Sequence, residues 1–113
     1  MTQSDDKFFE IVILGTGPAG LQAAIHAARA KASVLVMGRE SKSSLYRAHV
    51  ENYCCLSKVS GEDLLRQGIE QAKSAGAEFL YEDVVKTTQT EHGFQIDTES
   101  GPSIRTRALI LAM

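Results

Sequence analysis

Apolar positions in the first part of the chain follow two different patterns. Phe8 to Leu14 is a nearly continuous apolar run, which is typical of a strand buried on both faces of a parallel sheet. The next stretch, residues 18–30, is predicted to be a helix because its apolar residues recur at helical spacing: Leu21, Ala24, Ile25 and Ala28. Ser33 to Met37 is a second buried strand, so the order predicts a right-handed βαβ unit.

Three glycines, Gly15, Gly17 and Gly20, separate the first strand from the helix in the spacing G-x-G-x-x-G. Gly15 allows a tight turn, Gly17 lets the backbone approach a pyrophosphate, and Gly20 lets the helix lie close to the sheet. Pro18 suits the first helical position, where its missing N–H costs nothing. The free N–H groups of the first turn and the positive end of the helix dipole then face the phosphates. A tight turn without a ligand is the alternative, but the strand and helix on either side favour a dinucleotide fingerprint.

The second strand ends without the acidic residue that holds the ribose in a plain dinucleotide site. It closes on Met37-Gly38, and the nearest carboxylate is Glu40. This disfavours a typical NAD dehydrogenase and requires the ribose ligand to come from the following loop. Residues 39–60 form a long polar connection, in which no secondary structure is predicted. A structureless loop of that length is usually functional, and a surface excursion is the alternative.

The remainder of the chain predicts one more helix and then mostly strands. Ser60 with Asp63 resembles a capping box that opens a helix over 62–75, and Gly76 is the expected stop. A third parallel strand is predicted over 78–81. Three short antiparallel strands and a final apolar strand follow, at 84–90, 93–98, 103–107 and 108–113.

These elements together predict one fold class: α/β, a Rossmann-type FAD/NAD(P)-binding fold with a parallel βαβ sheet and a small antiparallel β-meander. Residues 1–113 are expected to be a single FAD/NAD(P)-binding domain. Because the chain stops on an uncovered apolar strand, we expect it to be a truncated portion of a larger two-dinucleotide-domain flavoprotein.

Composition narrows the choice of partners. The net charge of −2 gives no electrostatic case for nucleic acid or an anionic membrane. The polar start of the chain is not a signal peptide, so a cytoplasmic location is expected. Cys54 and Cys55 are adjacent and do not form C-x-x-C, so we interpret them as small semi-buried residues and predict no metal.

Several segments, in the right order, resemble the thioredoxin-reductase-like flavoproteins of the pyridine-nucleotide-disulfide oxidoreductases. They include Gly15-Thr-Gly-Pro-Ala-Gly20, Val34-Leu-Val-Met-Gly38, Val50-Glu-Asn-Tyr53 and Glu82-Asp-Val-Val-Lys86. The resemblance runs from about Phe8 to Met113. The family's Gly-Gly-Gln-Leu segment is replaced by Ser43-Ser-Leu45, which implies an altered flavin-facing loop. Its aromatic-Pro-Gly turn is replaced by Tyr53-Cys54-Cys55.

The resemblance assigns roles to individual residues. Glu40 is expected to hold the adenosine ribose, Asn52 to contact the flavin, and Val84 to reach the adenine through its backbone. The complete set of expected cofactor-binding residues is Gly15, Gly17, Pro18, Ala19, Gly20, Gly38, Arg39, Glu40, Leu45, Asn52 and Val84. No residue is assigned a catalytic role.

The resemblance also implies a function, the binding of FAD in a protein that passes electrons from NAD(P)H through FAD to a disulfide or another acceptor. A thioredoxin-like protein is the implied partner, and a homodimer is the implied assembly. Two alternatives stay open: a stand-alone, non-catalytic dinucleotide-binding module, and another two-dinucleotide flavoprotein such as a monooxygenase or an oxidase. The glycine at position 38 disfavours the second alternative.

Overall fold

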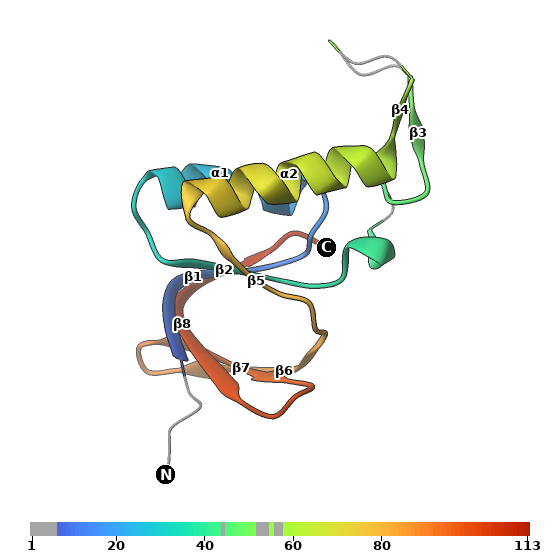
Figure 1. The fold of residues 1–113 in the computed structure, drawn as a ribbon. Helices are drawn as coiled ribbons and strands as arrows, with labels where there is room; N and C mark the ends of the chain where they lie inside the picture. The colour runs from blue at the N-terminus through green and yellow to red at the C-terminus, as the bar shows by residue number, and fades with distance from the viewer. Residues whose placement is uncertain (1–6, 44, 52–54, 56–57) are drawn as a thin grey trace.

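The protein forms one large mixed sheet with two helices packed on one of its faces (Figure 1). A computed structural model describes residues 7–43, 45–51, 55 and 58–113. The sheet consists of β1 (Lys7–Leu14), β2 (Val34–Met37), β5 (Glu78–Leu80), β6 (Val84–Thr90), β7 (Gly93–Thr98) and β8 (Ser103–Leu111). The helices are α1 (Pro18–Arg29) and α2 (Gly61–Ala75). The strand order is β5-β2-β1-β8-β7-β6, which confirms the predicted α/β fold class.

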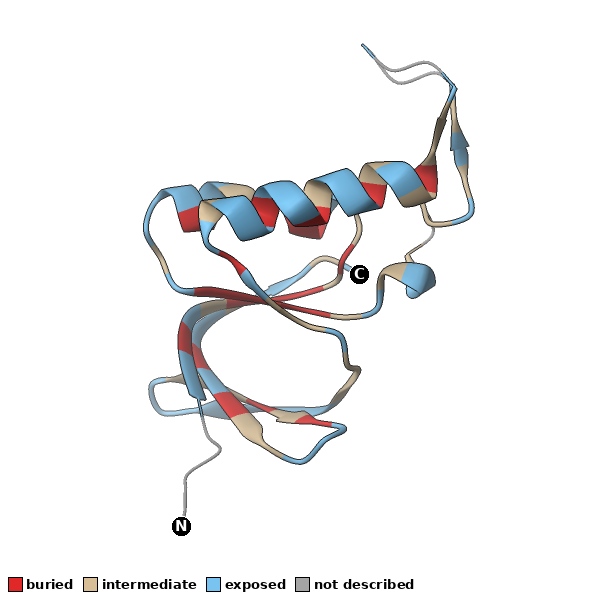
Figure 2. Ribbon diagram, in the orientation of Figure 1, coloured by how far each residue is buried: buried red, intermediate tan, exposed pale blue. Residues whose placement is uncertain are grey.

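The four strands β5, β2, β1 and β8 run parallel, and the two central ones, β2 and the second half of β1, are buried on both faces. On the helix face, Ile13 and Val36 pack against alanines of α1 and α2. On the opposite face, Leu14 and Met37 pack against Ile96 of β7. Figure 2 shows buried positions along these strands and on the sides of the helices that face them. Burial on both faces explains why β1 and β2 are nearly continuous apolar runs and not alternating ones.

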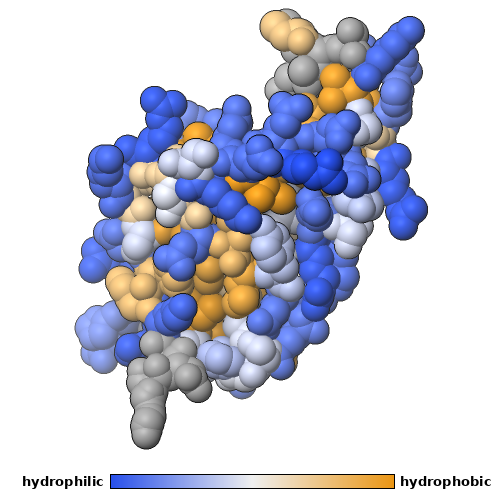
Figure 3. Space-filling model, in the orientation of Figure 1, coloured by the Kyte–Doolittle hydropathy of each residue, from blue (hydrophilic) through white to orange (hydrophobic). Residues whose placement is uncertain are grey.

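The antiparallel strands β6 and β7 extend the same sheet and curve away from the helices (Figure 1). Ile96 of β7 and Ile104 of β8 belong to the core cluster on the face without helices. Figure 3 shows hydrophobic side chains gathered in the region between the helices and the antiparallel strands, surrounded by hydrophilic ones. The curvature therefore encloses a second core beneath the parallel strands.

The predicted break between strands at 107/108 was wrong. Residues Ser103–Leu111 form the single strand β8, whose first half pairs antiparallel with β7. The same strand pairs parallel with β1 along nearly its whole length, from Ile104 opposite Lys7 to Leu111 opposite Leu14. Because β1 continues past the end of β7, it holds β8 extended where β7 no longer does.

The prediction of a structureless connection over 39–60 was also wrong for part of its length. The described residues include a short 3₁₀ helix, Glu40–Lys42, and a two-stranded ladder of β3 (His49–Val50) with β4 (Val59–Ser60). The predicted helix start is confirmed, because the Asp63 N–H donates to Ser60 Oγ at 3.1 Å. Gly76 ends α2 in the left-handed region at φ 116°, as expected of a C-terminal glycine.

Candidate functional site

The glycine turn, residues 15–20, is packed backbone against backbone. Gly15 has a φ of 127°, a conformation that favours glycine, and its N–H donates to Met37 O at 2.9 Å. A Cβ on Gly15 would lie 2.4 Å from the Ala112 carbonyl oxygen, and one on Gly20 would lie 2.2 Å from the Gly15 carbonyl oxygen. The turn therefore has no space for a side chain at either position, which ties the start of α1 closely to the end of β1.

Gly17 is different, because it is the N-cap of α1 and no backbone atom packs closely against it. Its φ of −80° is available to any residue, and an added Cβ would meet only Ser43 Oγ, at 3.2 Å. Pro18 lies in the first turn, no acidic residue is present there, and within the described residues no side chain caps the helix. The first-turn N–H groups of α1 and the positive end of its dipole are thus left available to an anion.

A cavity of about 1000 Å³ opens at this point, at the carboxyl ends of β1, β2 and β8. Its wall includes seven of the residues predicted to bind a cofactor: Gly15, Gly17, Pro18, Ala19, Gly38, Arg39 and Val84. The chain brings them from three places, namely the glycine turn, the end of β2 and the start of β6. In open α/β sheets, ligands bind in a crevice outside the carboxyl ends of the strands.

The other predicted residues do not line this cavity. Gly20 is buried behind the turn, where its close packing is structural. Glu40 lies in the 3₁₀ helix that follows β2. Leu45 packs against the core cluster of Leu21, Leu65 and Ile69. Asn52 lies outside the described residues.

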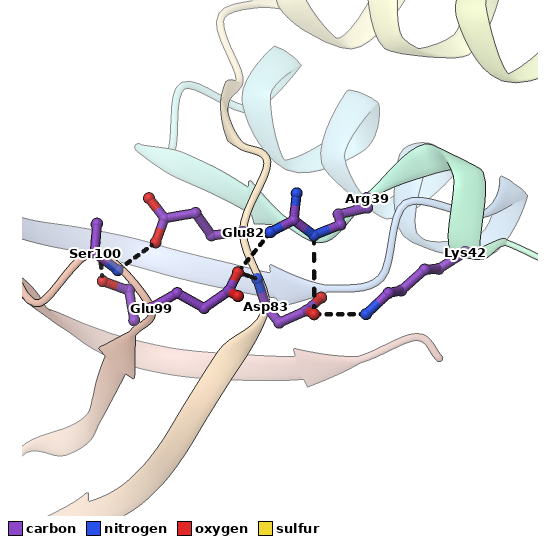
Figure 4. Close-up of polar contacts among 7 residues, drawn as sticks. Arg39, Lys42, Glu82, Asp83, Glu99 and Ser100 are labelled. Atoms are coloured by element: carbon purple, nitrogen blue, oxygen red, sulfur yellow. Dashed lines mark hydrogen bonds and ion pairs between the residues drawn. The ribbon is translucent and has the colours of Figure 1, made fainter.

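An ion-pair cluster of Arg39, Lys42, Asp83 and Glu99 forms beside the cavity (Figure 4). Arg39 Nη2 is 2.7 Å from Glu99 Oε1, and Arg39 Nε is 3.8 Å from Asp83 Oδ2. Lys42 Nζ donates to Asp83 Oδ2 at 2.5 Å. The Asp83 N–H also donates to Glu99 Oε1, at 2.7 Å. The cluster joins the segment after β2, the β5–β6 connection and the β7–β8 turn.

Both carboxylates of the ion-pair cluster are stabilised in their charged form. The hydrogen bond from Lys42 lowers the pKa of Asp83, and the charges of Lys42 and Arg39 lower it further against the desolvation that opposes them. The Asp83 backbone N–H lowers the pKa of Glu99, with Arg39 adding to the effect. Both carboxylates are therefore ionised at neutral pH.

Sequence reasoning missed the acidic members of this wall. Glu82 and Asp83 line the cavity, and Glu99 holds Arg39 at its side. The interacting pairs are separated by 60 residues for Arg39 and Glu99, and by 41 for Lys42 and Asp83. No local spacing signals such contacts. Only the strand order, which places the ends of β2, β5 and β7 near one another, would have revealed them.

Two further observations bear on the sequence-based expectations. In the part of the chain that the structure describes, His, Cys, Asp and Glu residues form no group of three or more that could hold a metal ion. Neither helix among those residues is long and apolar enough to cross a membrane.

Comparison with known sequences yields one family match. The family model described as "Pyridine nucleotide-disulphide oxidoreductase" matches residues 9–113. A thioredoxin reductase of Spironucleus barkhanus is 42% identical over 88 residues, which are 76% of this chain and 29% of that protein. A thioredoxin reductase of Aquifex aeolicus is 37% identical over 115 residues, which are 99% of this chain and 36% of that protein.

Solved structures support the same relationship. The thioredoxin reductase of Giardia duodenalis superimposes with a TM-score of 0.86 at 34% identity, covering 93% of this chain and 35% of that one. The chain thus spans about a third of the length of the proteins it matches.

Proposed function

Because the chain belongs to the pyridine nucleotide-disulphide oxidoreductase family, we propose that its cavity binds FAD as part of a thioredoxin-reductase-like flavoprotein. Residues 1–113 are then the FAD-binding domain of a larger protein with two dinucleotide-binding domains. The observation that carries the proposal is the open N-terminus of α1, which follows the glycine turn and faces the cavity of about 1000 Å³. This is the arrangement that binds the pyrophosphate of a dinucleotide.

Different residues of this site are proposed to bind different parts of FAD. The N–H groups near Gly17 and Ala19 hold the pyrophosphate, with Gly15 and Pro18 shaping the turn around it. Gly38, Arg39 and Val84 surround the adenosine, with Val84 contributing backbone atoms. Glu40 is proposed for the ribose, although it does not line the cavity as the structure describes it. Leu45 and Asn52 are proposed near the flavin.

FAD, when bound, supplies the electron transfer, and the protein supplies binding, orientation and electrostatics. In the whole protein, NAD(P)H is the proposed reductant, and a disulfide or another acceptor receives the electrons. A thioredoxin-like protein is the proposed partner, a homodimer the proposed assembly and the cytoplasm the proposed location. None of these partners is nucleic acid, in keeping with the net charge of −2.

Gly17→Val in the 113-residue chain is the direct test of the site. The valine side chain should occupy the pyrophosphate position in the cavity. It should leave α1 intact, because its Cβ meets only the end of the Ser43 side chain, at Oγ. We expect the wild-type chain to show the absorbance bands of bound flavin on titration with FAD. The variant should bind FAD at least about tenfold more weakly, which is equivalent to about 1.4 kcal/mol of binding free energy.

Gln22→Val is the matched control, because Gln22 is exposed on α1 and does not line the cavity. It should bind FAD like the wild type. Circular dichroism should show both variants folded. A wild-type chain that does not bind FAD would contradict the proposal, as would a folded Gly17→Val variant that binds FAD with unchanged affinity.

A second candidate is a dinucleotide-binding module without turnover. It needs only the glycine turn, the open N-terminus of α1 and the cavity, which are features of binding and not of catalysis. The two candidates differ in one measurement. Flavin bound to the module is not reduced by NADH or NADPH, whereas flavin bound to the proposed whole oxidoreductase is.

A further inference from the structure

The segment that follows β2 lies at the proposed adenosine end of the site. In dinucleotide-binding folds, an acidic residue near this position binds the ribose 2′-hydroxyl, whereas a nearby arginine accommodates a 2′-phosphate. Here Arg39 comes directly after Gly38, and Lys42 lies one helical turn further, both in the cavity wall. By residue type alone, these two cations favour a 2′-phosphorylated nucleotide.

The structure shows that both cations already have anionic partners. Arg39 Nη2 lies 2.7 Å from Glu99 Oε1, and Lys42 Nζ lies 2.5 Å from Asp83 Oδ2 (Figure 4). The Asp83 N–H binds the same Glu99 oxygen at 2.7 Å, which fixes the two carboxylates relative to each other. A phosphate that approached Arg39 or Lys42 would have to compete with these contacts.

The carboxylates also present negative charge to the cavity. Asp83 and Glu82 both line it, and Glu82 Oε1 is held by the Ser100 N–H at 2.9 Å. The pKa of Asp83 and that of Glu99 are lowered, so neither carboxylate is neutral at physiological pH. Like charges placed next to one another at a binding site strongly disfavour the wrong ligand.

We infer that Asp83 and Glu99 make this site selective for an adenosine nucleotide with a free 2′-hydroxyl. They do so by neutralising Arg39 and Lys42 and by repelling a 2′-phosphate. The inference rests on the proposed function, because it assumes that a dinucleotide occupies the cavity with its adenosine at the end of β2. It assigns to Asp83 and Glu99 a role in specificity that neither local spacing nor the glycine turn indicates.

The test compares ADP-ribose with 2′-phospho-ADP-ribose by calorimetric titration of the 113-residue chain. These probes differ only in the 2′-phosphate and contain no flavin or nicotinamide. We expect the wild type to bind ADP-ribose more tightly by at least about tenfold. The double variant Asp83→Asn/Glu99→Gln releases the two cations, and the preference should fall to about threefold or less, or reverse.

Two further variants separate specificity from general effects of charge. Glu78→Gln/Glu91→Gln removes the same charge from exposed positions that do not line the cavity, and should keep the wild-type preference. Adding Arg39→Met to the Asp83→Asn/Glu99→Gln variant removes one released cation, and should weaken binding of the 2′-phosphate again.

The outcomes distinguish the inference from the proposed function. If the wild type binds ADP-ribose but shows no preference, or prefers the 2′-phosphate, the inference is overturned and the dinucleotide site stands. An unchanged preference in a folded Asp83→Asn/Glu99→Gln variant overturns the inference in the same way. If neither probe binds the wild type, the proposed function fails and the inference fails with it.

Discussion

The cavity has two walls that are built on different physical principles. The glycine turn is made of main chain packed on main chain, with gaps too small for a single Cβ at Gly15 and Gly20. The ion-pair cluster is made of long side chains that remain substantially exposed, between 39% and 63% of each. Steric exclusion determines the shape of the first wall, and electrostatic attraction determines the arrangement of the second.

Because of this difference, we expect the glycine turn to affect mainly the stability of the fold and the ion-pair cluster to affect mainly the selectivity of binding. A packed backbone cannot shift without moving β1, α1 and the end of β8 together, so a change in the glycine turn affects the whole fold. Exposed ion pairs contribute little to stability, because solvent screens them and ordering the side chains has an entropic cost. Their charges can still decide which anion is admitted.

Gly20→Ala should produce the largest effect. Alanine is favoured over glycine inside a helix by about 1 kcal/mol, which alone would stabilise α1. The new Cβ, however, would lie 2.2 Å from the Gly15 carbonyl oxygen, an atom of a backbone that cannot rotate away. We expect a net loss of about 3 kcal/mol or more in the free energy of unfolding, measured by urea denaturation.

Gly17→Ala is the matched control for this substitution. It adds the same atom three positions earlier, where the nearest neighbour is the end of the Ser43 side chain at 3.2 Å. The cost should be about 1 kcal/mol or less. Equal losses in the two variants would show that the glycine turn is not the sterically determined wall described above.

The ion-pair cluster should reveal itself through the pH dependence of stability. Because the pKa values of Asp83 and Glu99 are lowered on folding, the folded chain binds fewer protons than the unfolded chain in the acidic range. Their stabilising contribution is therefore complete above the unfolded pKa of about 4, and it is lost as the pH falls through the lower folded values. The melting temperature of the wild type should exceed that of Asp83→Asn/Glu99→Gln at neutral pH.

This difference in melting temperature should shrink as the pH falls from about 5 to about 2. Glu78→Gln/Glu91→Gln is the control, since both residues are exposed and lie outside the ion-pair cluster. A difference between the wild type and Asp83→Asn/Glu99→Gln that stays constant over this range would mean that the two carboxylates do not stabilise the fold through their charge.

The two walls also differ in how far sequence could predict them. The glycine turn was predictable because Gly15, Gly17 and Gly20 are close in sequence, and the strand and helix beside them have clear periodicity. Most of the parallel sheet followed from its buried runs. Local patterns could not give the continuity of β8, since it depends on pairing with β1, nor the 3₁₀ helix at Glu40–Lys42.

The ion-pair cluster lay beyond sequence reasoning for the same reason. Arg39 was predicted to be part of the site, but its partner Glu99 lies in a turn 60 residues later. Before the register of β6, β7 and β8 is known, any of several acidic residues is an equally good partner. Contacts that depend on strand order are determined by the tertiary fold, so the pattern of charges along the chain does not predict them.

Salt should produce the smallest of these effects on the melting temperature, and it should act on only one of the two walls. The screening length falls from about 8 Å at physiological ionic strength to about 3 Å near 1 M, so exposed pairs weaken while close packing does not. Sodium chloride should therefore narrow the difference in melting temperature between the wild type and Asp83→Asn/Glu99→Gln. It should leave the difference between the wild type and Gly20→Ala unchanged. Using differences cancels the general influence of salt on apolar burial, which all the variants share. If salt narrowed both differences equally, the loss in Gly20→Ala would have an electrostatic origin, and the two walls would not rest on separate physical principles.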